Sequence, residues 1–330
     1  MSESFQALVV DNAGEFAVAV KRLELDRLPA GDVLVKVAYS SVNYKDGLAC
    51  RPDGNIVKTY PHVPGIDLAG TVVASSDGRF AVGQQVLATG YGIGVSHYGG
   101  YAEYARLPSD WVVPLPDGLS PKEAMIYGTA GFTAALSIER LEENGMSPEK
   151  GKVLVTGATG GVGSVAVAML AKKGYSVAAS TGKPAAADYL LALGADEIVS
   201  RQAVADGAGK PLNKQAWQAA VDPVGGASLA ATLSKIAYGG SVAVSGLTGG
   251  TAVPTTVMPF ILRGVNLLGI DSVFCPADRR RKLWNRMAED LKPAKLEALL
   301  EREISLHELP GALTDILDSK MTGRALVRLP

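Results

Sequence analysis

Residues 152–173 read KVLVTGATGGVGSVAVAMLAKK: an apolar run, a glycine-rich loop and a longer apolar stretch follow one another directly. The run at 152–156 predicts a strand, and the pattern at 161–173 predicts a helix. Glycines in such a loop allow a sharp turn, a close approach of backbone to a pyrophosphate, and tight packing of helix on strand. The helix start also offers free N–H groups to an anion. The residues expected to bind a dinucleotide phosphate are Gly160, Gly161, Val162 and Gly163. A glycine-rich turn that serves packing alone is the alternative.

The chain beyond this loop alternates between strand-like and helix-like segments. The expected elements are strands at 175–180 and ending near Val199, Asp222 and Gly246, a helix at 184–193, and a further strand at 263–272. Strands that alternate with helices form βαβ units and a parallel sheet. The sequence therefore predicts an α/β fold with a doubly wound parallel sheet.

The strand that ends at Ser180 indicates which dinucleotide this fold would hold. In an NAD-binding unit an Asp or Glu at this place takes the ribose 2′-hydroxyl, but here the chain continues Ser180-Thr181-Gly182-Lys183. Hydroxyls can hydrogen-bond a 2′-phosphate and a lysine can neutralise it. We therefore expect NADPH, bound by Ser180, Thr181 and Lys183. For Lys183 the alternative is an ordinary solvated lysine ahead of a helix.

The carboxyl ends of the later strands are expected at the same crevice, because doubly wound sheets bind their ligand there. This pattern places 222–225, 245–247 and 269–272 beside the cofactor.

The first 115 residues have a different texture. Short runs rich in β-branched or aromatic residues, separated by Gly, Pro, Asp and Ser, are typical of a small barrel or sandwich. These runs are 6–10, 32–39, 70–74 and 101–107. A capping box at Ser120–Glu123 opens a helical pattern that continues to about Asn144. Near the C-terminus, helical patterns at 277–291, 294–301 and 307–319 precede a strand at 324–329, which is expected to return to the first domain.

Composition and charge exclude several classes of protein. The chain has 330 residues, 47% hydrophobic and 20% charged, which is globular rather than disordered. Its net charge is −1 without a block of like charge, so no nucleic-acid surface is expected. No apolar run reaches the roughly 18 residues of a membrane helix, and the start of the chain, which carries Glu3, lacks the basic segment of a secretory signal. With only Cys50 and Cys275, a cytoplasmic protein without disulfides is expected.

Several further motifs resemble those of the medium-chain dehydrogenase/reductase superfamily. They are NYKDG at 43–47, PGIDLAG at 64–70, GGYAE at 99–103 and GTAGFTA at 128–134, and the match covers essentially the whole chain. The resemblance implies a GroES-like β-barrel domain, then a Rossmann domain, with the C-terminus returning to the barrel. The expected boundaries are 1–124 for the GroES-like catalytic domain, 125–272 for the NADP-binding domain and 273–330 for the return.

The zinc ligands of this superfamily are absent from the matching positions. Zinc-dependent alcohol dehydrogenases carry a cysteine where Asn43 stands and Gly-His-Glu where Gly65-Ile66-Asp67 stands. The four-cysteine lobe of those enzymes is missing as well. No catalytic zinc is therefore expected.

Within the zinc-free branch, the chain resembles the group often labelled quinone oxidoreductases, which includes NADPH-dependent acryloyl-CoA reductases. The motifs at 43–46, 60–67, 128–131 and 269–272 carry this resemblance. It implies reduction of the carbon–carbon double bond of a short 2-enoyl-CoA, the bond being conjugated to the thioester carbonyl. One departure is that Tyr91 and Tyr98 stand where tryptophan is expected, which changes the shape of a wall more than the chemistry.

The resemblance also implies contacts with the cofactor outside the glycine loop. The residues concerned are Tyr44, Thr133, Leu247, Ile261, Ser272 and Arg324. For Arg324, expected at the cofactor phosphates, a plain surface arginine is the alternative. The basic run 279–282 either grips the phosphates of CoA or forms a solvated helical face. The strand at 263–272 resembles one that pairs across a dimer two-fold, so a homodimer is expected.

The expected chemistry requires a hydrogen-bond and proton donor, and Tyr44 is the candidate. Without a metal, an oxyanion developing on the thioester needs hydrogen-bond donors, and the α-carbon needs a proton. Tyr44 is the expected donor; Asn43 and Asp67 are expected to shape the same pocket, and Asp46 to orient its neighbours. The alternative for Tyr44 is packing of its ring on the cofactor, with water as the proton source. Reduction of a quinone and a non-catalytic NADPH-binding redox sensor are the competing functions.

Overall fold

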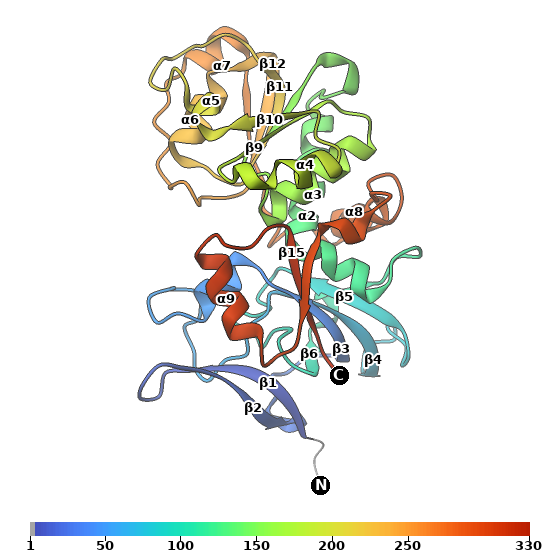
Figure 1. The fold of residues 1–330 in the computed structure, drawn as a ribbon. Helices are drawn as coiled ribbons and strands as arrows, with labels where there is room; N and C mark the ends of the chain where they lie inside the picture. Colours follow the sequence, from blue (N-terminus) through green and yellow to red (C-terminus); the bar gives the residue numbers. More distant parts are fainter. Residues whose placement is uncertain (1–3) are drawn as a thin grey trace. The chain divides into compact units, whose positions relative to one another are not determined.

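The computed structural model describes residues 4–330, so Glu3 lies outside the described part of the chain (Figure 1). The chain divides into two compact units. Unit 1 contains the chain up to Thr129 together with Val273–Ala288 and Leu300–Pro330, and unit 2 contains Ala130–Ser272 and Glu289–Leu299. The division into domains 1–124, 125–272 and 273–330 stays a proposal. Within the last of these ranges, Glu289–Leu299 packs in unit 2.

Unit 1 is built around a seven-stranded sheet in the order β14-β15-β3-β4-β5-β7, with β6 paired to β3. Its strands are β3 (Val33–Ser41), β4 (Asp67–Ser75), β5 (Gln85–Thr89), β6 (Tyr104–Leu107), β7 (Val112–Pro114), β14 (Leu300–Ile304) and β15 (Arg324–Arg328). A separate pair joins β1 (Ser4–Asp11) to β2 (Ala17–Glu24). Val33, Val35 and Val37 alternate into the core and are fully buried, as the period of two in a strand requires.

The C-terminal strand lies in this first sheet. β15 pairs antiparallel with β3, and Leu326 lies opposite Ser41. This pairing confirms that the C-terminus returns to the first domain.

The helix expected at 294–301 is wrong, because no α-helix forms in this range. Leu296–Leu299 forms the short turn η5, and Leu300–Ile304 is then strand β14, parallel to β15. Pairing with a distant strand overrides the helix preference of the local Leu, Glu and Arg residues, because strand formation depends on the neighbouring strand.

Four helices of the described residues begin in unit 1. They are α1 (Tyr44–Ala49), α2 (Pro121–Glu143), α8 (Ala277–Ala288) and α9 (Leu309–Leu317), with short turns η1 (Leu25–Arg27) and η2 (Ser109–Trp111). The expected capping box opens α2: the Glu123 amide donates to Ser120 Oγ at 3.2 Å, and the Ser120 amide donates to Glu123 Oε2 at 2.9 Å.

A break at Gly128 interrupts α2, with φ 53° and ψ −156°. Glycine is required there, because a Cβ would lie 2.4 Å from Ser41 Oγ and 2.6 Å from Asp67 Oδ2. The break frees the Thr129 amide from the helix, and this amide donates to Asp67 Oδ2 at 2.8 Å.

Unit 2 holds a six-stranded parallel sheet in the order β10-β9-β8-β11-β12-β13. The strands are β8 (Val153–Val155), β9 (Val177–Thr181), β10 (Glu197–Ser200), β11 (Trp217–Asp222), β12 (Ile236–Val244) and β13 (Asn266–Gly269). The helices are α3 (Gly161–Lys172), α4 (Ala187–Ala192), α5 (Arg201–Ala205), α6 (Gly226–Leu233) and α7 (Met258–Arg263), with turns η3 (Pro148–Lys150) and η4 (Pro184–Ala186). The doubly wound sheet is therefore confirmed.

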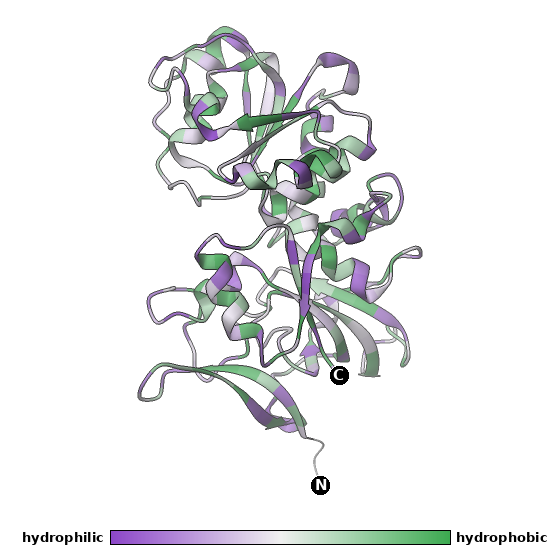
Figure 2. Ribbon diagram, in the orientation of Figure 1, coloured by the Kyte–Doolittle hydropathy of each residue, from purple (hydrophilic) through white to green (hydrophobic). Residues whose placement is uncertain are grey.

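The central strand β8 is apolar throughout, as is typical of a strand covered on both faces. Val153, Leu154 and Val155 are fully buried, and Figure 2 shows hydrophobic residues along the strands of this sheet. β13 is shorter than the strand expected at 263–272, because α7 continues to Arg263 and ends at Gly264 in the left-handed conformation. No helix within residues 4–330 is long and apolar enough to cross a membrane.

Candidate active site

The loop after β8 has the geometry of an anion site at the start of α3. Gly157 has a φ of 54°, in the left-handed region that favours glycine. Gly160 caps α3 without a side-chain hydrogen bond, and the first turn of α3 contains no acidic residue. The N–H groups of that turn are therefore open to a phosphate. A Cβ at Gly163 would lie 2.3 Å from the Gly157 carbonyl oxygen, so only glycine lets the helix pack this closely. These residues fit the pyrophosphate of a dinucleotide.

The end of β9 gathers the hydroxyls expected to meet a 2′-phosphate. Ser180 and Thr181 are buried, and the Ala158 amide donates to the Ser180 carbonyl at 2.9 Å, which ties the glycine loop to this strand. Thr181 Oγ1 accepts a hydrogen bond from the Lys183 amide at 3.0 Å. The structure thus places these three residues beside the glycine loop.

Arg201 is a second cation at this strand end, and the sequence reasoning missed it. A Cβ at Gly182 would lie 2.4 Å from Cζ and Nε of Arg201, so the guanidinium lies against that glycine. The register between β9 and β10 explains why Arg201 lies there. β10 runs parallel to β9 with Ser200 opposite Thr181, so the residue that follows β10 arrives beside Gly182. Arg201 and Lys183 can together neutralise a phosphate.

Of four residues of unit 2 that are expected to contact the cofactor, two are hydrogen-bonded to one another and two are exposed apolar side chains. Thr133 Oγ1 donates to Ser272 Oγ at 2.9 Å, although 139 positions separate them. Leu247 and Ile261 are instead exposed apolar side chains, 60% and 69% accessible. Their contact with a cofactor stays a prediction.

In unit 1, Asp67 is the centre of a buried polar cluster. Its Oδ1 accepts from the Ser41 amide at 3.0 Å. Its Oδ2 accepts from Ser41 Oγ at 2.7 Å, from Asn43 Nδ2 at 2.9 Å and from the Thr129 amide at 2.8 Å. The carboxylate therefore gathers β3, α1 and the break in α2 around one point.

Asn43 bridges two carboxylates. Its Nδ2 donates to Asp67 Oδ2 at 2.9 Å and to Asp46 Oδ2 at 3.1 Å. A side-chain amide has only two N–H donors, so both are directed at these carboxylates. Asn43 can donate to a substrate oxygen only by giving up one of them, which favours a role in holding the cluster.

Asp46 lies on the other side of Asn43 and is fully buried. It accepts from the Asn43 amide at 3.0 Å and from the Ile66 amide at 3.0 Å. Burial, and then the charge of nearby Asp67, raises the pKa of Asp46 to about 7. Burial also raises the pKa of Tyr101, whose hydroxyl donates to the Ser41 carbonyl at 3.1 Å.

Tyr44 differs from its neighbours because it is not buried. It begins α1 directly after Asn43, and its side chain is 41% exposed. The cluster thus fixes the backbone on which Tyr44 stands, while the phenol remains accessible to a ligand.

Arg324 is not a plain surface arginine, since only 2% of it is exposed. Its Nη2 donates to Ser41 Oγ at 2.8 Å and to Asn43 Oδ1 at 3.3 Å. Its Nη1 and Nε donate to the carbonyls of Val42 and Ile126, at 3.1 and 3.0 Å. The structure therefore joins Arg324 to the Asn43–Asp67 cluster, and a contact with cofactor phosphates stays a prediction.

The basic run 279–282 is not uniformly solvated. Arg280 is 1% exposed, and its Nη1 donates to both oxygens of Thr89 at 2.8 Å. Its guanidinium also lies 4.6 Å from the centre of the Tyr91 ring, which itself stacks on Trp111 at 5.5 Å. For Arg280 a solvated face is therefore wrong, because it holds the turn that follows β5; a contact of the basic run with CoA stays a prediction.

A zinc ion does not fit the residues present. Asn43 and Ile66 occupy the two lost ligand positions, and within residues 4–330 no group of three His, Cys, Asp or Glu side chains could hold a metal.

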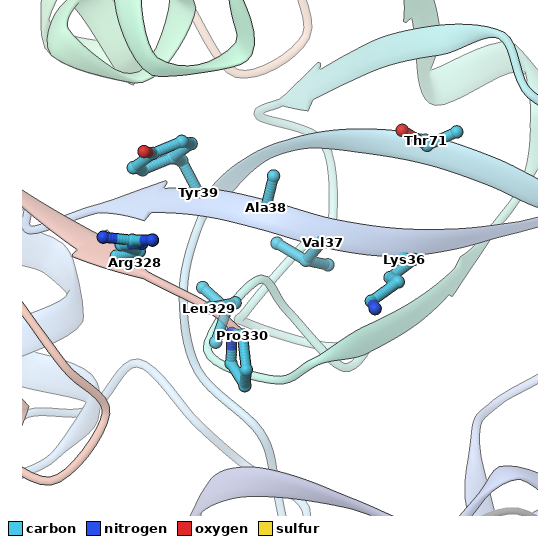
Figure 3. Close-up of a pocket in the computed structure, with 8 residues that line it drawn as sticks. All are labelled: Lys36, Val37, Ala38, Tyr39, Thr71, Arg328, Leu329 and Pro330. Atoms are coloured by element: carbon cyan, nitrogen blue, oxygen red, sulfur yellow. The ribbon is translucent and has the colours of Figure 1, made fainter.

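A separate hollow of about 250 Å³ lies on unit 1, where β3 meets the C-terminal residues (Figure 3). It is lined by Lys36, Val37, Ala38, Tyr39, Thr71, Arg328, Leu329 and Pro330. These are not the residues expected at the active site.

Comparison with known families identifies the class. Residues 29–117 match the alcohol dehydrogenase GroES-like domain, and residues 161–289 match the zinc-binding dehydrogenase family. Together with the relatives below, these matches show that the chain belongs to the medium-chain dehydrogenase/reductase superfamily, and it is an NAD(P)-binding oxidoreductase.

Individual relatives show to which group within this superfamily the chain belongs. The chain is 63% identical to "Putative quinone oxidoreductase YhfP" of Bacillus subtilis over 100% of both chains. It is 53% identical to the acrylyl-CoA reductase AcuI of Ruegeria pomeroyi over 98% of both. The chain is thus a member of the group that contains YhfP and the AcuI acrylyl-CoA reductases.

Two solved structures share the fold and were determined with different dinucleotides. The structure of YhfP with NAD bound has a TM-score of 0.97 at 63% identity, covering 99% of this chain and 100% of that one. The YhdH oxidoreductase of Salmonella enterica in complex with NADP has a TM-score of 0.94 at 49% identity, covering 98% and 100%.

Proposed function

We propose that this protein is an NADPH-dependent reductase of short 2-enoyl-CoA thioesters such as acryloyl-CoA. The observation that carries the proposal is an accessible phenol, Tyr44, placed directly beside the buried Asn43–Asp46–Asp67 cluster. The relationship to AcuI supports the choice of substrate.

The reaction adds one hydride and one proton across the double bond. NADPH held at Gly160–Gly163 and at the end of β9 would supply the hydride for the β-carbon and would leave as NADP⁺. The Tyr44 hydroxyl would donate a hydrogen bond to the oxygen of the resulting enolate and give its proton to the α-carbon, and solvent would return a proton to the exposed tyrosinate. The products are the saturated acyl-CoA and NADP⁺.

The preference for NADPH rests on the end of β9. Ser180, Thr181 and Lys183 lie there without a carboxylate between them, and Arg201 adds a second cation against Gly182. An acidic residue would repel a 2′-phosphate, whereas this set attracts one.

Quinone reduction is the second candidate, because YhfP carries that name at 63% identity. A quinone accepts a hydride without a carbon-bound proton, so the two candidates differ in their need for Tyr44.

Isotope transfer tests the proposed reaction. With NADPH deuterated at the transferred position, crotonyl-CoA should yield butanoyl-CoA with deuterium at the β-carbon, and reaction in heavy water should place deuterium at the α-carbon. Product without label at the β-carbon would contradict direct hydride transfer.

We also propose a homodimer formed through β13. This strand is the edge of the unit 2 sheet, and Leu267 on it and Leu262 on the preceding helix α7 are exposed. Natural proteins cover such edges, and a second copy would do so. Leu262→Glu should give a monomer in light scattering if this is the interface. A cytoplasmic setting stays part of this proposal, because a chain with only Cys50 and Cys275 is typical of a reducing compartment.

A further inference from the structure

Asp46 is a fully buried carboxyl group that the proposed reaction does not use. It is the third residue of α1, and it joins the first turn of that helix to the segment before β4 through the Asn43 and Ile66 amides. Because α1 has only six residues, it has little stability of its own and depends on such anchors.

Arg324 holds the opposite end of the same side-chain amide. Asn43 Oδ1 accepts from Arg324 Nη2 at 3.3 Å, while Asn43 Nδ2 donates to Asp46 and Asp67. Arg324 also donates to Ser41 Oγ, which in turn donates to Asp67. The four side chains of Arg324, Ser41, Asp67 and Asn43 therefore form a closed ring, and Asp46 is attached to it at Asn43.

The far side of α1 is held by packing. A Cβ at Gly47 would lie 2.8 Å from Leu317 Cγ and 3.1 Å from the Leu313 carbonyl, both on α9. The helix thus lies between an apolar contact and the polar ring. Tyr44, its first residue, is the exposed side chain at the junction.

We propose that Asp46 and Arg324 are positioning residues that act through Asn43 to fix the direction of the Tyr44 phenol. This inference rests on the proposed role of Tyr44. Neither residue needs to touch the substrate, because a small displacement of a proton donor is enough to lower the rate.

A double-mutant cycle in kcat with acryloyl-CoA tests the proposal. Asp46→Asn keeps the size of the side chain but places an N–H group against donors, so kcat should fall on the order of 10-fold or more, with little change in the KM for NADPH. In the Tyr44→Phe background the same substitution should cost nothing further, because the group it positions is gone. Equal losses in both backgrounds would overturn the proposal. Should Asp46→Asn fail to fold, Arg324→Lys, which keeps the charge but loses the fork, takes its place.

A matched control separates positioning from loss of a charge. Asp315→Asn makes the same chemical change on α9 and removes the ion pair with Arg302, but Asp315 does not touch Asn43. It should leave kcat unchanged.

Fluorine NMR provides a readout that does not depend on the substrate. In protein labelled with fluorotyrosine, the resonance that Tyr44→Phe removes should shift or broaden in Asp46→Asn and stay in place in Asp315→Asn. An unmoved resonance would overturn the proposal even if the enzyme reduces acryloyl-CoA. Absence of turnover by the wild type, with the resonance shifted as expected, would instead contradict the proposed function.

Discussion

Arg201→Ala should weaken the binding of NADPH about 10-fold and leave the binding of NADH unchanged. The Arg201 guanidinium lies against Gly182 at the end of β9, where the 2′-phosphate would lie. A charge-assisted hydrogen bond contributes about 1.5–3 kcal/mol. Arg201 is exposed, and screening by solvent favours the lower value. Since about 1.4 kcal/mol corresponds to a factor of ten, the expected rise in Kd for NADPH is about 10-fold.

Gly182→Ala tests the same contact without removing the charge. The added Cβ would lie 2.4 Å from Arg201 Cζ, so the guanidinium must withdraw by about 1 Å to reach an ordinary contact. NADPH binding should therefore weaken in the same direction, though by less than in Arg201→Ala.

Fluorescence titration of both dinucleotides on the wild type and the two variants provides the measurement. Arg140→Ala, which removes a half-exposed arginine of α2 paired with Glu143, is the matched control and should change neither Kd. Equal losses for NADPH and NADH, or no loss for NADPH, would refute the reasoning.

Three further substitutions or conditions test other parts of the structure. Gly163→Ala places a Cβ 2.3 Å from the Gly157 carbonyl oxygen, so it should lower the free energy of unfolding by about 1–3 kcal/mol and weaken the binding of both dinucleotides. The control Gly311→Ala on α9, where a Cβ meets open space, should leave the melting temperature unchanged or raise it. If Gly163→Ala melts at the same temperature as the wild type, the packing argument is contradicted. Tyr44→Phe should lower kcat with acryloyl-CoA at least about 10-fold if the phenol is a general acid, and an unchanged kcat would remove it from that role. Burial and Asp67 raise the pKa of Asp46 to about 7, so the native state binds this proton more tightly than the unfolded state. The free energy of unfolding should therefore decrease from about pH 4 to about pH 7, and a slope that persists unchanged in Asp46→Asn would show that another group causes it.

Much of the fold could be predicted because its signals are local. The strand, glycine loop and helix at 152–173 follow one another in sequence, and their order alone fixes the geometry of the phosphate site. The strand β14 could not be predicted in the same way. Its residues 300–304 form a strand only because β15 lies beside them, and no local pattern contains that partner.

The candidate site shows the same division. Ser180, Thr181 and Lys183 are adjacent in sequence, so their shared strand end was evident. Arg201 reaches that end through the register of two neighbouring strands, which the sequence does not state.

The role of Asn43 is a further example. Its position predicted that it shapes the pocket, and the structure adds how: its side-chain amide donates to the buried carboxylates of Asp46 and Asp67. Three-dimensional placement of these carboxylates was needed to see this.

The oxidation of NADPH with acryloyl-CoA, crotonyl-CoA and 1,4-benzoquinone, measured side by side with NADH as the control, tests the central claim most directly. The proposed function predicts turnover of the thioesters with NADPH and much less with NADH. Turnover of benzoquinone without turnover of either thioester would contradict it.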